Sequence, residues 1–272
     1  MTARGPLKAG EPVLLVDRKK RRYLIDLAAG GEFHSHSGVL SHDELIGSKE
    51  GALFRSTRGM AFIALRPTIS DFVLKMPRGA QVIYPKDIGP ILMLADVFPG
   101  ARVLEAGLGS GALSIAMLRA GAHITGYEIR ADFLSRAVSN VTRFLGPEVL
   151  DRYDADVRDV YAGIGASDLD RVVLDLPEPW QVVPHAQDSL RPGGIFVAYT
   201  PSIMQVAQLH ARLESSAFGM AQTTEVLNRG WHVADQAVRP DHRMVAHTGF
   251  LTSARLLSES PKTQNPRSPR SI

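Results

Sequence analysis

The sequence contains no cysteine. Disulfide bridges, thiolate zinc sites and thiol nucleophiles are therefore excluded, and any catalysis must use other side chains. No apolar run approaches the roughly 20 residues that cross a bilayer, and residues 1–12 lack the apolar core of a signal peptide. These absences favour a soluble globular protein in the cytoplasm.

The chain is long enough for one large domain and one small domain. Its 272 residues are 44% hydrophobic, which is sufficient to bury a substantial core. Short apolar segments separated by turns are typical of strands, and they occur at residues 12–17, 22–27 and 60–65, with a connection rich in Gly and His at 30–38. We therefore predict a small β domain over residues 1–70.

From residue 85 onward, helix-like and strand-like segments alternate. Expected helices cover residues 85–98, 111–120, 131–146, 182–190 and 203–216, and expected strands cover residues 101–106, 123–128, 171–176 and 194–200. This alternation predicts an α/β fold, with a parallel sheet covered by helices on both faces, in a larger domain over residues 71–257.

The end of the chain has a different pattern. Residues 225–240 and 247–257 follow one another with no helix between them, which predicts an antiparallel pair at one edge of the sheet. Residues 258–272 are rich in Ser, Pro and Arg and have little to bury, so we expect a disordered tail.

Three glycines at alternate positions, Gly107, Gly109 and Gly111, directly follow the strand expected at 101–106. Ligands of open parallel sheets bind at the carboxyl ends of the strands, so this turn lies in the ligand position. A dinucleotide fold requires G-x-G-x-x-G, whereas this sequence has G-x-G-x-G preceded by Glu105. A carboxylate there would repel a pyrophosphate and attract a cation, while the glycines allow sharp bends and close approach of a bulky nucleoside.

Two further acids follow the next strands. Glu128 lies at the end of the second strand, where an acid can accept hydrogen bonds from both ribose hydroxyls, and Asp156 lies near the end of the third, placed to meet an adenine amino group. Taken singly, each acid is commonly a strand-end cap or a solvated residue. As an ordered set, they outline an adenosine ligand with a positive charge and no phosphates, which is S-adenosylmethionine.

The fourth strand leads into the sequence DLPEPW at residues 175–180. An acid followed by prolines and an aromatic residue at this position is similar to the D-P-P-Y type motif, with which amino-directed methyltransferases hold a planar nitrogen nucleophile. Alternatively, Asp175 is a helix N-cap, and Pro177 and Pro179 only end the strand.

Several segments together resemble the tRNA (adenine-58-N1)-methyltransferase family in its single-polypeptide bacterial and archaeal form. The resemblance covers nearly the whole chain and is carried by residues 79–87, 103–114, 127–133, 175–180, 196–202 and 239–251. The glycine loop is common to many methyltransferases, whereas YPKD, DLPEPW and HTGFL in that order are specific.

The resemblance implies a homotetramer of class I, Rossmann-like S-adenosylmethionine-dependent methyltransferase domains that makes 1-methyladenosine in the T loop of tRNA. It implies a catalytic Asp175 and aromatic contacts of Tyr84 and Tyr199 near the target base. His247 precedes an expected strand and could face the site, with a structural histidine as the alternative. The cofactor would be held by Glu105, Gly107, Leu108, Gly109, Ser110, Gly111, Glu128, Phe133, Asp156 and Asp175. The chain departs from the family at Glu178, which has no assigned role, and at a Gly-Pro pair inside the helix expected at 85–98.

The chemistry also favours these residues. Methyl transfer from a sulfonium requires a nucleophile held in line near the methyl carbon, so positioning dominates catalysis. Positive charge develops on adenine when N1 takes the methyl group, and the Asp175 carboxylate could stabilise it by accepting a hydrogen bond from the exocyclic amino group. Tyr84 and Tyr199 could stack on a base that has left the tRNA helix, although tyrosines in strands are more often packing residues.

Residues 1–30 carry seven Lys and Arg against three Asp and Glu, with five of the cations in the basic cluster Arg18–Arg22. This cluster either binds tRNA phosphates or is a solvated hairpin turn. His34, His36 and His42 have no carboxylate at a suitable spacing, so we expect a polar loop and no metal site.

Three other functions share part of this pattern. A nicotinamide dehydrogenase would share the sheet and Glu128, but the glycine spacing and Glu105 disfavour it. A protein isoaspartyl methyltransferase has a similar segment before the glycine loop, but it has no use for DLPEPW. A non-catalytic RNA-binding subunit is disfavoured because one chain carries the cofactor acids together with Asp175.

Overall fold

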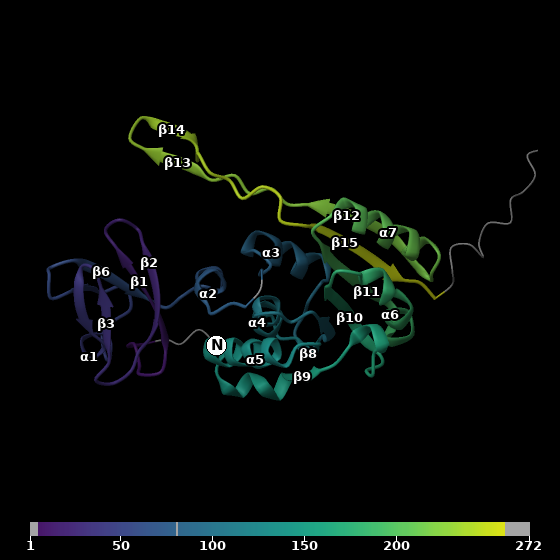
Figure 1. The fold of residues 1–272 in the computed structure, drawn as a ribbon, viewed down its shortest axis with the longest axis horizontal. Helices are drawn as coiled ribbons and strands as arrows, with labels where there is room; N and C mark the ends of the chain where they lie inside the picture. Colours follow the sequence, from purple (N-terminus) through teal and green to yellow (C-terminus); the bar gives the residue numbers. More distant parts are fainter. Residues whose placement is uncertain (1–4, 80, 259–272) are drawn as a thin grey trace, which may run out of the picture.

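The computed structural model describes residues 5–79 and 81–258. A small sheet near the N-terminus and a larger sheet with its helices lie side by side (Figure 1). Within the described residues, no helix has the length and apolar character needed to cross a membrane. The tail that we expect to be disordered lies outside these residues from position 259 onward.

The small sheet is antiparallel and has the strand order β2-β1-β6-β5. Its strands are β1 (Pro12–Asp17), β2 (Arg22–Asp26), β5 (Leu53–Arg55) and β6 (Ala61–Leu65). The expected connection at 30–38 instead contains most of a separate hairpin, β3 (Glu32–Ser35) and β4 (Gly38–Ser41), followed by α1 (His42–Leu45). The apolar side chains of Phe33 and Leu40 explain this hairpin, because they pack on the core around Phe62.

The large sheet has the strand order β12-β15-β11-β10-β7-β8-β9. Its strands are β7 (Arg102–Ala106), β8 (His123–Glu128), β9 (Tyr153–Val157), β10 (Leu169–Asp175), β11 (Leu190–Thr200), β12 (Phe218–Glu225) and β15 (Phe250–Leu256). Strands β7 to β11 are parallel to one another, and β15 is antiparallel to both β11 and β12.

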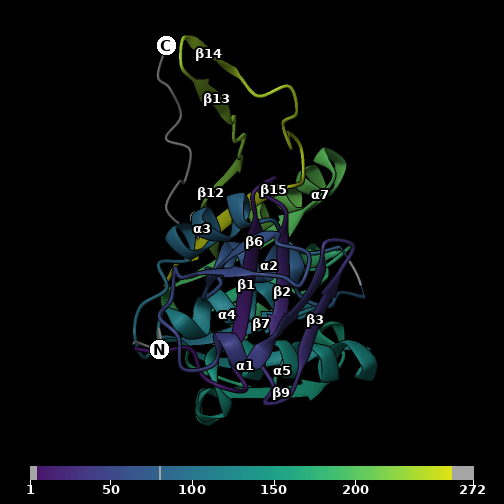
Figure 2. The same ribbon diagram turned by 90° about the vertical axis from the view of Figure 1, so that its left-hand side faces the viewer.

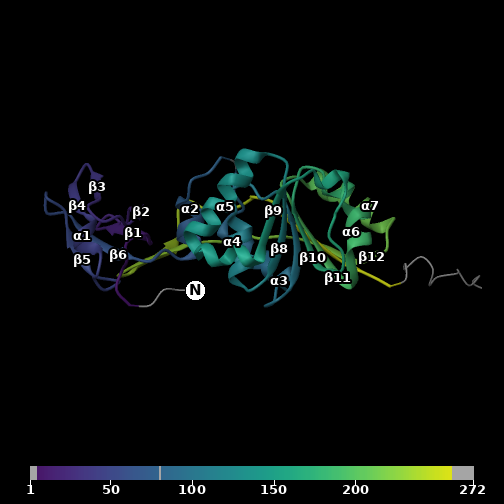
Figure 3. The ribbon, with the colours of Figure 1, turned by 90° about the horizontal axis from the view of Figure 1, so that it is seen from below.

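Helices cover both faces of the large sheet. They are α2 (Ile69–Lys75), α3 (Pro85–Leu94), α4 (Ala112–Arg119), α5 (Ala131–Leu145), α6 (Val183–Ser189) and α7 (Ile203–Glu214), with short 3₁₀ turns η1 (Pro147–Arg152), η2 (Val160–Ala162) and η3 (Pro179–Gln181). Successive strand residues point to opposite faces, so Val173 packs with α2 to α5 while Leu174 packs with α6 and α7. Figure 3 shows the strands between these two helical layers.

The end of the chain differs from the prediction. The antiparallel pair at the sheet edge is formed by β12 and β15, whereas residues 231–240 form a separate hairpin, β13 (Trp231–Ala234) and β14 (Ala237–Pro240). We call residues 226–249, which carry this hairpin, the arm. It projects from the body of the molecule (Figure 2). The pairing follows burial, because β15 supplies buried Leu251 and Ala254 to the sheet while the hairpin residues are exposed.

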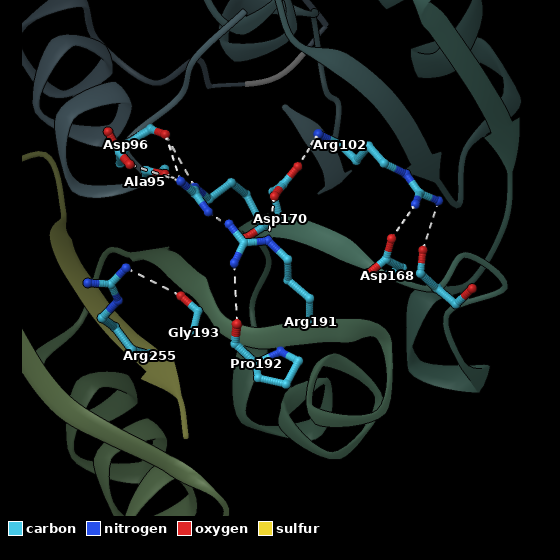
Figure 4. Close-up of polar contacts among 11 residues, drawn as sticks. Ala95, Asp96, Arg102, Asp168, Asp170, Arg191, Pro192, Gly193 and Arg255 are labelled. Atoms are coloured by element: carbon cyan, nitrogen blue, oxygen red, sulfur yellow. Dashed lines mark hydrogen bonds and ion pairs between the residues drawn. The ribbon is translucent and has the colours of Figure 1, made fainter. Parts of the chain in front are cut away.

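The helix expected at 85–98 forms as α3 and continues through Gly89 and Pro90. It ends earlier than expected, because Asp96 adopts a positive φ of 46°. Beyond this end lies the fully buried guanidinium of Arg171, which donates hydrogen bonds to the main-chain oxygens of Ala95, Asp96 and Asp170. Figure 4 labels these three acceptor residues. Arg171 therefore joins the C-terminal end of α3 to the start of β10.

Replacing Arg171 by Met should lower the free energy of unfolding by roughly 2–3 kcal/mol, because buried carbonyl oxygens would lose their donor. Urea unfolding followed by circular dichroism measures this effect. The control is Arg102→Met, which breaks an ion pair with Asp168 whose two side chains are 52% and 73% exposed and should cost less than about 1 kcal/mol. Equal losses in the two variants would contradict the capping role of Arg171.

Candidate cofactor and catalytic site

The carboxyl ends of the parallel strands bring the predicted acids to one edge of the large sheet. Strand β7 leads into the glycine loop, β8 ends at Glu128 and β10 ends at Asp175. A small cavity lies at this edge. It is lined by Gln81, Val82, Ile83, Glu105, Gly107, Leu108, Gly109, Ser110, Ala112, Leu113 and Asp175. The structure therefore brings most of the predicted cofactor residues together.

The three glycines of the loop have different roles. All have positive φ, at 85° for Gly107, 54° for Gly109 and 82° for Gly111, so each allows the sharp bend that was predicted. A Cβ at Gly107 would collide with the main-chain oxygen of Asp175, and a Cβ at Gly111 would press on the backbone of Ala137. Only Gly109 faces open space, so close approach of a nucleoside is possible there, whereas the other two glycines serve packing within the protein.

Glu105 lies beneath the loop and is almost completely buried. Burial, together with the charge of Asp175, raises its pKa to about 8, although hydrogen bonding with Ser114 acts in the opposite direction. Its Oε2 atom and the Oγ atom of Ser110 are buried without a hydrogen-bond partner among the described residues. Such atoms are costly, and a bound ligand could supply their partners.

Glu128 fixes the glycine loop, a contact that the sequence did not reveal. Its Oε2 accepts a hydrogen bond of 3.0 Å from the amide of Gly109, and its Oε1 accepts one of 3.1 Å from the amide of Arg130. A carboxylate oxygen can accept a second bond, so both oxygens keep capacity for ribose hydroxyls. That ribose contact remains a prediction.

Asp175 is the last residue of β10, and β7 lies between this strand and β8, which ends at Glu128. Burial, together with the negative charge of Glu128, raises the pKa of the Asp175 carboxyl to about 7. The alternative role as a helix N-cap is wrong, because the next turn, η3, begins at Pro179 with Glu178 in the cap position. Glu178 accepts a hydrogen bond of 2.6 Å from Gln181, which gives this unassigned residue a local structural role.

Phe133 and Asp156 lie at the same edge but do not line the cavity. Phe133 is in the first turn of α5, with the guanidinium of Arg130 stacked 3.9 Å from the ring centre. Asp156 is exposed in β9 and pairs in register with Tyr127 of β8. Their roles toward the cofactor remain predictions.

Gln81, Val82 and Ile83 are site residues that sequence reasoning missed. They line the cavity from the segment that leads into α3. Asn140 holds the neighbouring chain in place, because its side-chain amide donates to the main-chain oxygens of Pro77 and Ser110. In the sequence, the apolar pair Val82 and Ile83 directly before YPKD could have indicated that this segment is part of the site.

The three predicted substrate-binding residues, Tyr84, Tyr199 and His247, have different surroundings. Tyr84 is half-buried and immediately precedes α3. Tyr199 donates a hydrogen bond of 2.5 Å to the main-chain oxygen of Thr248, and burial raises its pKa to about 12. Both ring nitrogens of His247 are occupied, by Glu225 at 2.7 Å and by the main-chain oxygen of Pro201 at 2.8 Å. This arrangement raises the pKa of His247 and favours its structural alternative.

The N-terminal histidines do not converge. His42 is buried and accepts a hydrogen bond of 3.1 Å from the amide of Ala28, whereas His34 lies 3.0 Å from Glu32 on the surface. In the part of the chain that the structure describes, no three His, Asp or Glu side chains come together in a way that could hold a metal ion.

The burial of Glu105 predicts a pH-dependent effect of Glu105→Gln on stability. The folded protein holds the Glu105 proton up to about pH 8, whereas the unfolded chain loses it near pH 4.5, so this group contributes less stability as pH rises through that window. Glutamine does not titrate. The melting temperature of the variant relative to wild type should therefore increase between about pH 5 and pH 8 without ligand. A constant difference would show that Glu105 is ionised in the fold.

Comparisons with known proteins identify the family. A family model described as "tRNA methyltransferase complex GCD14 subunit" matches residues 59–239, and a TrmI-like N-terminal model matches residues 5–53. The tRNA (adenine(58)-N(1))-methyltransferase TrmI of Thermus thermophilus is 37% identical over 247 residues, which cover 90% of this chain and 96% of that protein. The tRNA (adenine(57)-N(1)/adenine(58)-N(1))-methyltransferase TrmI of Methanocaldococcus jannaschii is 33% identical, with coverage of 90% and 95%.

Solved structures agree with the sequence comparisons. A tRNA methyltransferase TrmI from Aquifex aeolicus superposes with a TM-score of 0.82 at 29% identity and covers 94% of this chain and 100% of that one. A SAM-dependent O-methyltransferase from Thermotoga maritima superposes with a TM-score of 0.87 at 32% identity, with coverage of 93% and 95%. The predicted class I fold with a small N-terminal β domain is confirmed, and the chain belongs to the tRNA (adenine-58-N1)-methyltransferase family.

Proposed function

We propose that this protein transfers the methyl group of S-adenosylmethionine to N1 of adenine 58 in the T loop of tRNA, giving 1-methyladenosine. The observation that carries the proposal is the position of Asp175 against the glycine loop, in a chain that aligns over 90% of its length with relatives named for this activity. Because tRNA is the substrate, we place the reaction in the cytoplasm.

The residues at the sheet edge fit S-adenosylmethionine. When bound, this cofactor supplies an electrophilic methyl group on a positively charged sulfur. Glu105 and Asp175 line the cavity, and Glu128 supports its loop, so three carboxyl groups make the region favourable for a cation. The unpaired Oε2 of Glu105 and Oγ of Ser110, together with the open face of Gly109, offer polar contacts and room for a ligand.

Asp175 is the proposed catalytic residue. As a carboxylate, it would accept a hydrogen bond from the exocyclic amino group of the target adenine and stabilise the positive charge that develops during transfer. The same contact would disfavour guanine, whose corresponding oxygen cannot donate.

The same charges weigh against the alternative substrate, a protein isoaspartyl carboxyl group. A substrate carboxylate would have to approach the carboxylate of Asp175, which is the active form of this group, and like charges repel strongly where water is excluded. A neutral adenine carries no such penalty.

Part of the basic cluster Arg18–Arg22 is available to tRNA phosphates. It lies at the turn between β1 and β2, as the hairpin alternative predicted, and its Arg21 and Arg22 are paired with Asp17 and Asp71. The side chains of Arg18, Lys19 and Lys20 are exposed. We infer that these three side chains contact tRNA phosphates, and that other surfaces supply the rest of the affinity for tRNA.

We also infer that copies of the chain associate in pairs through the arm, as one of the contacts within the homotetramer that the resemblance implies. Trp231, Val233 and Val238 in its hairpin are 58%, 69% and 61% exposed. An isolated two-stranded hairpin is marginally stable in water, so this apolar ribbon is better accounted for by contact with the same ribbon of a second copy.

The proposed function is tested with unmodified tRNA transcripts that carry either adenine or guanine at position 58. After incubation with protein and isotopically labelled S-adenosylmethionine, nucleoside analysis by mass spectrometry should find labelled 1-methyladenosine in the adenine transcript and no label in the guanine transcript. A different labelled nucleoside would contradict the proposal.

The raised pKa of Asp175 predicts the pH dependence of the reaction. The carboxylate is the active form, so the single-turnover rate should rise with pH. The midpoint should lie at or below about 7, because a bound cation lowers the pKa of Asp175 from its value in the free protein. Asp175→Asn should reduce this rate by about 10²- to 10³-fold and flatten the profile. Cofactor affinity, measured by calorimetry, should change much less. A near-normal rate for the variant would remove Asp175 from catalysis.

A further inference from the structure

A buried ion pair lies at the first turn of α3, within the YPKD segment. Asp87 has no exposed surface, and its Oδ1 lies 2.8 Å from the Nζ of Lys86. Its Oδ2 accepts a hydrogen bond of 2.6 Å from the hydroxyl of Thr248. Both oxygens of a fully buried carboxylate are thus satisfied by specific partners, so this charge has a fixed place in the fold.

The ion pair contacts both ends of the arm, where the arm joins the large sheet. Lys86 donates a hydrogen bond of 2.7 Å to the main-chain oxygen of Val226 on the outgoing strand, and its side chain is only 6% exposed. Asp87 receives Thr248 from the returning strand. The start of α3 therefore fixes the separation and register of the two ends of the arm.

Thr248 connects this ion pair to the catalytic edge of the sheet. Its main-chain oxygen accepts the hydroxyl of Tyr199, and the ring of Tyr199 lies so close to Gly249 that a Cβ there would collide with it. Tyr199 is in turn the register partner of Asp175 in the adjacent parallel strand. A continuous set of contacts therefore runs from Asp87 through Thr248 to the neighbour of the catalytic acid.

We propose that Asp87 is a positioning residue, which through the hydroxyl of Thr248 holds Tyr199 and the ends of the arm in the arrangement that methyl transfer requires. This inference rests on the proposed function and on the prediction from the sequence that Tyr199 lies near the target base. A buried ion pair adds little stability compared with apolar side chains of similar size, whereas it fixes geometry closely. Displacement of the arm would therefore displace Tyr199, so association of copies through the arm would influence the site.

The test compares two threonine-to-valine substitutions in and beside β15. Thr248→Val keeps the shape of the side chain and removes the hydroxyl that binds Asp87. Thr252→Val removes an equally specific hydroxyl, which is completely buried and lies 2.7 Å from that of Thr223 in β12. Thr248→Ser retains the hydroxyl and serves as the conservative replacement.

Thr248→Val should lower the single-turnover rate at saturating tRNA and cofactor by roughly 10- to 100-fold, the scale of a small misplacement, with cofactor affinity within about twofold of wild type. Thr248→Ser should restore most of the rate. Thr252→Val should reduce the melting temperature and leave the rate unchanged. Equal rates for the two valine variants, each measured on folded protein, would show that Thr248 is only structural and would overturn the inference.

Hydrogen exchange separates this inference from the proposed function. Thr248→Val should increase amide exchange at residues 198–200 and 225–228 relative to Thr252→Val, whatever substrate the enzyme methylates. If wild-type protein makes no 1-methyladenosine, the proposed function fails, and this exchange difference still decides the link between Asp87 and Tyr199. Absence of the difference overturns the link.

Discussion

The contact on which the site depends is the close approach of Gly107 to the main-chain oxygen of Asp175. It joins the turn after β7 to the end of β10, two strands that are neighbours in the sheet. Because a side chain at Gly107 would occupy the position of that oxygen, only glycine permits the approach, and its φ of 85° is one that glycine adopts without strain. One backbone contact therefore sets both the loop that receives the cofactor and the acid that faces the substrate.

The buried carboxyl groups of the site destabilise the free protein and favour the binding of a cation. Burial, together with the charge of a neighbouring carboxyl group, raises the pKa of Glu105 to about 8 and that of Asp175 to about 7. Such groups are costly in the free protein, and a sulfonium cation would relieve part of that cost on binding. Arg171 lies near the start of β10, far from the carboxyl end of this strand, and contributes to stability there.

Much of this arrangement could be predicted from the sequence, because parallel strands impose a regular pattern. Hydrophobic alternation predicted the strands and helices of the large sheet, and acids at strand ends meet at one edge wherever strands are parallel. The β12–β15 pairing and the separate hairpin could not be predicted, since strand order depends on long-range burial. The contacts of Glu128 with the amide of Gly109, and of Asp87 with Thr248, were equally inaccessible, because they join residues 19 and 161 positions apart.

The most direct measurement is the affinity for S-adenosylmethionine of Gly107→Ala and Gly100→Ala, by calorimetry. Gly100 has a φ of 86°, and a Cβ there would meet nothing within 4 Å, so this variant carries the same backbone strain, about 1–2 kcal/mol, without the collision. Gly100→Ala should bind the cofactor as wild type does, and Gly107→Ala should bind it at least about tenfold more weakly, a loss of about 1.4 kcal/mol. Equal affinities in the two variants would contradict the central role of the contact between Gly107 and Asp175.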